Sequence, residues 1–195
     1  MELSEVMREV EKDVVFFDDS GGGVTFSGGE PLSQPDFLEA LLSACRARGI
    51  HTVLETCGYA PPRTFASAVA LADLVLYDLK LVDAVRHRLY TGRSNDWILE
   101  NLLMLSRSGR PFLVRVPIVP SINDNGPDLR EIAEFLRRAT IRRLSLLSYH
   151  QTGRAKYERL HIPYRLGELA PPSPDRMAEI AASFSQRGFE VTIGG

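Results

Sequence analysis

A glycine-rich segment holds the first residues whose types and order suggest chemistry. It runs from Gly21 to Pro31 and reads GGGVTFSGGEP, so glycines stand before and after four strand-forming residues. Glycine lets the backbone come close to a ligand and offer its own amides and carbonyls. A tight turn with positive φ explains the glycines about equally well, and a phosphate-binding nest is a third interpretation. Glu30, directly after two glycines, favours a ligand site.

Polar side chains recur where later apolar runs end. They are Glu30, Glu55, Asp78, Lys80 and His150. In parallel α/β proteins ligands bind at the carboxyl ends of the strands, so we expect these side chains to belong to one functional edge. Asp78 and Lys80 are two residues apart and can face the same side of a strand, although a structural ion pair is a competing interpretation.

Arg115 and His150 are the next candidates. Arg115 lies within the apolar run Phe112 to Val119, where a guanidinium must meet an anion or several acceptors to offset its desolvation. A ligand carboxylate, Glu30 or Glu55 would serve. His150 follows a predicted strand rather than lying on a core face, so we favour a ligand contact for it.

Cys45 and Cys57 are the only cysteines, which is too few for a disulfide scaffold and gives no pair with metal-ligand spacing. Cys45 lies on a predicted apolar helix face and is interpreted as a core residue, whereas Cys57 lies at the rim after a strand. One rim thiol cannot anchor a metal cluster. The expected compartment is the reducing cytoplasm.

The composition predicts one globular domain over residues 1–195. Hydrophobic residues make up 44% of the 195 residues, enough to bury a core. The net charge is −2, with 23 basic and 25 acidic residues mixed along the chain, which gives no electrostatic footprint for nucleic acid or an anionic membrane. No apolar run is long enough to span a bilayer.

Helical and strand patterns alternate along the chain. Helices are predicted at Glu2 to Asp13, from Pro35 to before Gly49, at Pro62 to Leu71, Val85 to Tyr90 and Asp96 to Ser106, around Leu129 to Leu136, and from Pro174 to before Gly188. Strands are predicted at Gly23 to Phe26, His51 to Glu55, Leu74 to Tyr77, Phe112 to Val119, Leu144 to Leu147 and Phe189 to Ile193. This alternation predicts right-handed β-α units in a parallel sheet, either doubly wound or curled into a barrel.

Five sequence blocks in order carry a resemblance to a known family. GGGVTFSGGEPL, HTVLETCGY, LVLYDLK, VRVPIVP and SYHQTGRAKY, with VTIGG at the end, resemble the glycyl-radical-enzyme activating proteins of the radical S-adenosylmethionine (SAM) superfamily, such as pyruvate formate-lyase activating enzyme. The resemblance implies an α/β fold, a partial (β/α) barrel of the radical SAM type. Such a protein binds S-adenosylmethionine beside a 4Fe-4S cluster and cleaves it reductively, so that a radical forms on a glycine of a partner enzyme.

The resemblance also implies a role for each residue that matches a motif. The set expected to hold S-adenosylmethionine is Ser27, Gly28, Gly29, Glu30, Glu55, Lys80, Arg115 and His150. The first four would hold the methionine amino group, chiefly through backbone. Glu55 and Lys80 would contact the ribose and the methionine carboxylate, His150 would lie along the nucleoside, and Arg115 would face the incoming glycine loop.

Further expectations concern a cation and the protein partners. Asp78, Glu55, Thr56 and the backbone of Leu76 match a monovalent-cation site of the family. The partners implied are a glycyl-radical enzyme and an electron donor such as flavodoxin or ferredoxin. Glu55 and Cys57 stand where the pyruvate formate-lyase branch has aspartate and asparagine, which leaves the identity of the glycyl-radical enzyme open.

The family's CxxxCxxC loop, which gives the cluster three thiolates, does not occur in these 195 residues. The sequence is therefore expected to be a C-terminal portion that lacks the first strand and its cysteine loop and is inactive alone. Without that strand, Gly23 to Phe26 would lie at a sheet edge, which predicts self-association there or cover by the N-terminal helix.

Two other functions stay open at this point. One is a non-catalytic binding module that docks a partner protein. The other is an aldolase-like barrel with Lys80 as a Schiff-base amine, which the fold would tolerate.

Overall fold

The computed structural model describes residues 2–150, 159, 161 and 169–194. Its contacts group into two compact units, Met1–Asp78 with Arg93–Val114, and Leu79–Gly92 with Arg115–Gly195, and each is described by itself. The strands follow the sequence in the order β1-β2-β3-β4-β5-β6. The prediction of a single domain over residues 1–195 stays a prediction.

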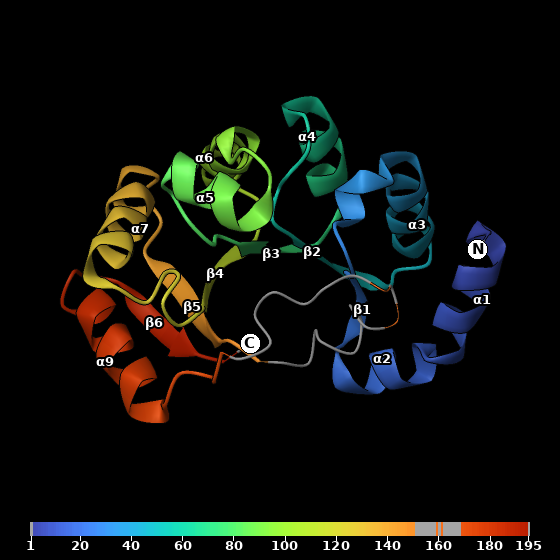
Figure 1. Cartoon of the computed structure of the whole chain (residues 1–195). Coiled ribbons are helices and arrows are strands. Elements are labelled where there is room, and N and C mark those ends of the chain that lie inside the picture. The colour runs from blue at the N-terminus through green and yellow to red at the C-terminus, as the bar shows by residue number, and fades with distance from the viewer. Residues whose placement is uncertain (1, 151–158, 160, 162–168, 195) are drawn as a thin grey trace. The chain divides into compact units, whose positions relative to one another are not determined.

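The first unit begins with two helices and then alternates strands with helices (Figure 1). Its elements are α1 (Leu3–Lys12), α2 (Val14–Ser20), β1 (Gly23–Phe26), η1 (Pro31–Ser33), α3 (Pro35–Ala47), β2 (His51–Thr56), α4 (Pro62–Leu71), β3 (Leu74–Asp78), α6 (Asp96–Arg107) and the first residues of β4 (Phe112–Ile118). The second unit holds the rest of β4 with α5 (Ala84–Thr91), α7 (Gly126–Arg138), β5 (Arg143–Ser148), α9 (Pro174–Ser185) and β6 (Glu190–Ile193).

Local signals set most helix boundaries. Pro35, Pro62 and Pro174 each occupy the first helical position, where a missing backbone N–H costs nothing. Ser173 caps α9 by accepting a hydrogen bond from the amide of Arg176. The predicted helices and strands are confirmed, with differences of up to three residues at their ends.

Parallel pairing sets which side chains share a face. β1 pairs with β2 and β2 with β3, so that Val24 lies opposite Thr52 and Glu55 opposite Leu76. Side chains along β2 alternate strictly, with Thr52, Leu54 and Thr56 buried and the residues between them more exposed. In the second unit β5 pairs with β6, also in parallel.

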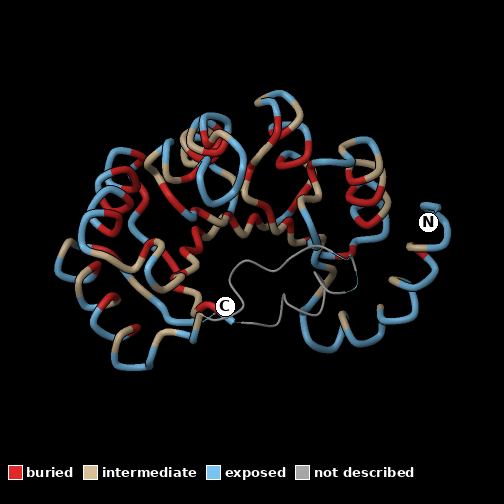
Figure 2. The backbone as a smooth tube through the Cα atoms, in the orientation of Figure 1, coloured by how far each residue is buried: buried red, intermediate tan, exposed pale blue. Residues whose placement is uncertain are grey.

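Each unit has its own buried residues (Figure 2). In the first, helices and strands bury Leu42, Leu54, Phe65, Tyr77 and Leu102 almost completely. In the second, the corresponding residues are Ile132, Leu136, Leu144, Ile180 and Phe184. Burying a side chain of this size contributes about 2 kcal/mol relative to leaving it exposed.

A smaller cluster joins the N-terminal helix to α3. Met7 of α1 packs with Leu41, Cys45 and Ile50, and the Cys45 sulfur lies 4.0 Å from the Met7 sulfur. Arg48 at the end of α3 pairs with Glu11 of α1 at 2.5 Å, an exposed ion pair that contributes little. These contacts dock α1 on α3. Self-association through the edge of β1 stays a prediction.

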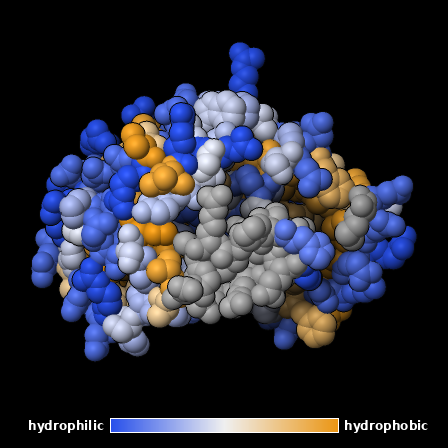
Figure 3. Space-filling model, viewed as in Figure 1, coloured by the Kyte–Doolittle hydropathy of each residue, from blue (hydrophilic) through white to orange (hydrophobic). Residues whose placement is uncertain are grey.

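Helix α2 and the short helix η1 are absent from the sequence prediction. Val14 and Phe17 of α2 pack against the cluster around Met7, whereas Val15 and Phe16 are 76% and 69% exposed. Figure 3 shows apolar side chains, in orange, at the surface among hydrophilic ones. No helix in the described part of the chain is long and apolar enough to cross a membrane.

Candidate functional site

The loop after β1 is open and polar. Gly28 and Gly29 both have positive φ, 86° and 62°, a conformation that other residues rarely adopt. A Cβ at either position would meet nothing within 4 Å, so the glycines are required by conformation rather than by a close neighbour. No hydrogen bond joins either glycine to another described residue. As far as the described part of the chain is concerned, their amides and carbonyls are therefore open to a ligand.

Glu30 ends this loop, and its carboxylate holds neighbouring segments together. Thr56 Oγ1 donates to Glu30 Oε1 at 2.5 Å, and the Cys57 amide and thiol both donate to Oε2 at 2.9 Å. The Leu32 amide donates to Oε1 at 3.2 Å, which caps η1. One side chain thus joins the loop after β1 to the end of β2.

A second layer of hydrogen bonds supports the end of β2. The Gly58 amide donates to Thr56 Oγ1 at 2.8 Å. Asn101 of α6, which is fully buried, donates through Nδ2 to the carbonyls of Gly58 and Ala60 at 2.8 and 2.9 Å. Its Oδ1 has no partner among the described residues, so the two donated bonds are the reason a polar residue is tolerated here.

Tyr77 of β3 fills the space beneath this turn. Gly58 has a φ of 73°, and a Cβ there would lie 1.9 Å from Tyr77 Oη. The Tyr77 hydroxyl donates to the Ile98 carbonyl at 2.6 Å. Burial, with the nearby Cys57 and Glu30, raises the pKa of Tyr77 well above its usual value. The hydroxyl therefore stays protonated and remains a donor.

The predicted cation ligands divide between the two faces of the strands. Glu55 and Leu76 lie opposite each other on β2 and β3, and Asp78 is two residues further along β3 on the same face. Thr56 points to the other face, where its hydroxyl is bonded to Glu30. Only the Thr56 carbonyl remains for such a site. In the described residues no three His, Cys, Asp or Glu side chains gather to hold a metal, and the cation site stays a prediction.

Lys80 lies in the second unit, just after β3. Its side chain is exposed, and its carbonyl accepts a hydrogen bond from Asn123 Nδ2 at 2.8 Å. Asn123 is buried and also donates to the Pro117 carbonyl at 2.7 Å, which fixes the backbone of Lys80 to the end of β4. Sequence reasoning passed over Asn123.

Arg115 and His150 are also in the second unit. Arg115 is 7% exposed within β4, and its carbonyl accepts from the Leu79 amide at 2.9 Å. His150 is exposed, directly after the buried Tyr149. The rest of the predicted block SYHQTGRAKY, residues 151–157, lies outside the described residues. The ligand roles predicted for Arg115 and His150 stay predictions.

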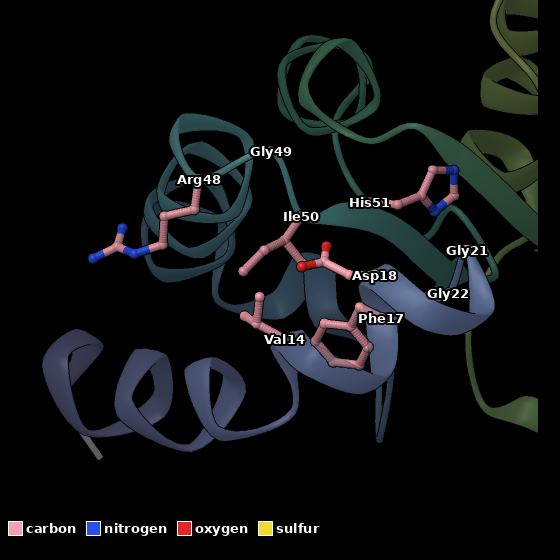
Figure 4. Close-up of a pocket in the computed structure, with 9 residues that line it drawn as sticks. All are labelled: Val14, Phe17, Asp18, Gly21, Gly22, Arg48, Gly49, Ile50 and His51. Carbon is pink, nitrogen blue, oxygen red and sulfur yellow. The ribbon is translucent and has the colours of Figure 1, made fainter.

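A cavity of about 300 Å³ lies at the opposite, amino end of β1 and β2. Figure 4 shows Val14, Phe17 and Ile50 facing one another there, with the Asp18 carboxylate beside them and Arg48 pointing away. The predicted ligand residues are not among those that line it. Because ligands of parallel α/β proteins bind at the carboxyl ends of strands, we place the functional site at the loop after β1 and not in this cavity.

The two cysteines do not fit an iron–sulfur cluster. Cys45 lies in the hydrophobic cluster with Ile50, just before β2 begins, and Cys57 comes directly after β2 ends. A strand of six residues spans about 20 Å, so the two thiols lie at opposite ends of β2. Cubane clusters require several thiolates around one centre. The interpretation of Cys45 as a core residue is confirmed, since it is 0% exposed.

The fold is that of a parallel α/β protein, with the candidate site at the carboxyl ends of its strands. Residues 1–136 match the model of the Radical SAM superfamily. A trans-4-hydroxy-L-proline dehydratase activating enzyme from Clostridioides difficile is 39% identical over 196 residues, covering 99% of this chain and 65% of that protein. An isethionate sulfite-lyase activating enzyme from Nitratidesulfovibrio vulgaris is 45% identical over 169 residues, covering 86% and 55%.

Solved structures agree with these relatives. A domain of a pyruvate-formate lyase-activating enzyme from Bacteroides vulgatus has a TM-score of 0.74 and 29% identity, covering 89% of this chain and 99% of that one. A radical SAM methyltransferase from Sphaerobacter thermophilus has a TM-score of 0.71 at 13% identity, over 98% of this chain and 56% of that one, and shares the fold. The chain belongs to the radical SAM superfamily, and its relatives are activating enzymes. The predicted family and partial-barrel fold are confirmed.

Proposed function

We propose that this chain binds S-adenosylmethionine at the loop Ser27 to Glu30 and is the nucleoside-binding part of an activating enzyme for a glycyl-radical enzyme. The observation that carries the proposal is the pair of open glycines. Gly28 and Gly29 present backbone amides and carbonyls that no described residue occupies. Backbone carbonyls suit the ammonium of a methionine group, which has donors and no acceptor.

The remaining ligand contacts are assigned by chemistry. Lys80 provides a cation for the methionine carboxylate, and Glu55 provides acceptors for the ribose hydroxyls. His150 is assigned to the nucleoside and Arg115 to the partner's glycine loop. Bound S-adenosylmethionine would supply the precursor of the 5′-deoxyadenosyl radical. This chain's residues hold and orient that molecule.

No radical-generating step is assigned to these residues. A 4Fe-4S cluster needs thiolates that Cys45 and Cys57 do not supply together. The chain spans 65% of the first relative described above and 55% of the second, so the activity of the whole protein is part of the proposal. The relatives' names differ in the enzyme that is activated, so the choice of partner for this chain is also part of the proposal. An electron donor such as flavodoxin or ferredoxin and a cytoplasmic location complete the proposal.

Calorimetric titration of the chain with S-adenosylmethionine tests the assignment. Lys80→Ala is expected to weaken binding about tenfold, because it removes a charge-assisted contact with the carboxylate. Lys12→Ala is the matched control, since Lys12 is an exposed lysine of α1 paired with Glu9. Equal affinity in the wild type, the Lys80 variant and the Lys12 variant would contradict the role of Lys80. Absence of binding in the wild type would contradict the proposed function itself.

A further inference from the structure

Resting on the proposed function, we infer that Glu30 is a positioning residue: its carboxylate locks the glycine loop to the end of β2 and does not itself touch the ligand. The sequence motif alone favours a direct contact, because a carboxylate beside two glycines is a natural partner for an ammonium group. The hydrogen bonds that the Glu30 carboxylate accepts favour the positioning role instead.

A count of hydrogen bonds decides between these roles. An ionised carboxylate has two oxygens with about four acceptor positions in all. Leu32 N and Thr56 Oγ1 occupy Oε1, and the amide and thiol of Cys57 occupy Oε2. All four donors belong to the protein. An ammonium group could reach Glu30 only by displacing one of them, and a buried donor without a partner is costly.

The same contacts fix the loop in place. Glu30 follows Gly29 directly, so holding its side chain sets where the carbonyls of the two glycines point. Thr56 is 3% exposed, and its hydroxyl both donates to Glu30 and accepts from Gly58. Asn101 then anchors Gly58 to α6. Two αL glycines in open space have no other support among the described residues, so Glu30 supplies the rigidity that a ligand site needs.

The other end of β2 provides a matched comparison. Thr52 is 0% exposed, and its hydroxyl donates to Asp73 Oδ2 at 2.9 Å, just as that of Thr56 donates to Glu30. Thr52→Val and Thr56→Val therefore make the same chemical change on one strand. Both variants lose a hydroxyl–carboxylate bond, and only the second affects the glycine loop.

The test measures binding of S-adenosylhomocysteine and of 5′-methylthioadenosine, which lacks the amino and carboxylate groups, together with the amide NMR signals of Gly28 and Gly29. Thr56→Val is expected to weaken S-adenosylhomocysteine about tenfold and to leave 5′-methylthioadenosine unchanged. Thr52→Val should alter neither affinity by more than about twofold, and Thr56→Ser should restore binding because it keeps the hydroxyl. Without ligand, the Gly28 and Gly29 signals should shift in Thr56→Val and not in Thr52→Val.

Other results would contradict the positioning role or the proposed function. Direct contact predicts that Thr56→Val binds S-adenosylhomocysteine as tightly as the wild type or more tightly, since it frees an acceptor on Glu30, and this result would overturn the inference. If the wild type binds neither ligand, the proposed function fails while the glycine signals still decide the positioning role. Should Thr56→Val not fold, Cys57→Ala against Cys57→Ser repeats the comparison at the next donor.

Discussion

The two ends of strand β2 use the same bond for different purposes. At the amino end the hydroxyl and the amide of Thr52 both bond to Asp73, which closes the start of β2 onto the residue before β3. At the carboxyl end Thr56 is one of several donors to Glu30, and the network continues through Gly58 to Asn101 on α6. The first arrangement is local packing, and the second positions an open loop.

The cavity lies at the end of β2 that lacks this network. The cavity of about 300 Å³ lies near Ile50 and His51, whereas at the carboxyl end Gly28 and Gly29 are exposed. Strand direction and hydrogen-bond connectivity, rather than cavity volume, are therefore the grounds for proposing the site at the carboxyl end. The polar groups that define a site can be held ready on an open surface by a buried network beneath it.

Alanine substitution at the two turn glycines should give the largest difference in stability between the two ends of β2. Gly49, before β2, and Gly58, after it, have nearly equal φ values of 70° and 73°. An alanine at either position therefore carries a similar backbone strain. A Cβ at Gly49 meets nothing within 4 Å, whereas at Gly58 it overlaps the Tyr77 ring. We expect Gly49→Ala to cost about 1 kcal/mol and Gly58→Ala roughly 3 kcal/mol of unfolding free energy. Urea denaturation measures both.

Tyr77→Phe provides the control for this pair. It removes the hydroxyl that the new methyl would strike first, and so should recover part of the loss in Gly58→Ala and none in Gly49→Ala. Equal destabilisation by the two alanines would show that Tyr77 moves aside freely. The turn would then be less rigid than its hydrogen bonds indicate.

The two cysteines should report the same contrast through their reactivity. Cys45 is 0% exposed, and burial, against the opposing effect of Arg48, raises the pKa of its thiol. A raised pKa leaves less thiolate at any given pH, and the thiolate is the reactive form. Cys57 is partly exposed. Maleimide labelling at pH 8 should modify Cys57 at least about tenfold faster than Cys45, with Cys45→Ala and Cys57→Ser assigning the two phases. Comparable rates would mean that α1 opens readily from α3.

Much of the fold could be predicted because the signals that begin and end its helices and strands lie within those segments of the sequence. Proline and capping residues mark the helix starts, and the apolar runs mark the strands. Helix α2 could not be predicted in this way, because the run VVFF has strong strand-forming residues and becomes helical where Val14 and Phe17 pack against α1 and α3. Tertiary contacts decided that segment.

The ligand roles predicted for the candidate site stay predictions, but its internal hydrogen bonds can be compared with what the sequence indicates. The residue types around the glycines identified Glu30, yet its donors Thr56 and Cys57 come from a segment about 26 residues away, and nothing local reveals the pairing. Asn101 did leave a signal, since it shares the inward face of α6 with Ile98, Leu102 and Leu105. A polar residue on an apolar face must find partners, and that expectation would have pointed to a turn it supports.

The smallest expected effect is a change in titration at the amino end. Burial acts to raise the pKa of Asp73, and the hydrogen bonds from Thr52 together with nearby His51 and Arg110 outweigh it, so the pKa is lowered below 3.8. A carboxyl with a lowered pKa stabilises the fold above its unfolded value, and this contribution is lost as the pH falls through the folded value. Thr52→Val removes one of the lowering bonds, so Asp73 should titrate at a higher pH, and the stability deficit of this variant should shrink as the pH falls through the folded pKa. Carboxyl NMR signals followed against pH measure the pKa directly, and Thr56→Val should leave Asp73 unchanged. An Asp73 pKa that moves equally in both variants would mean that the two ends of β2 are coupled along the strand, which would remove the basis for using Thr52 as the control for Thr56.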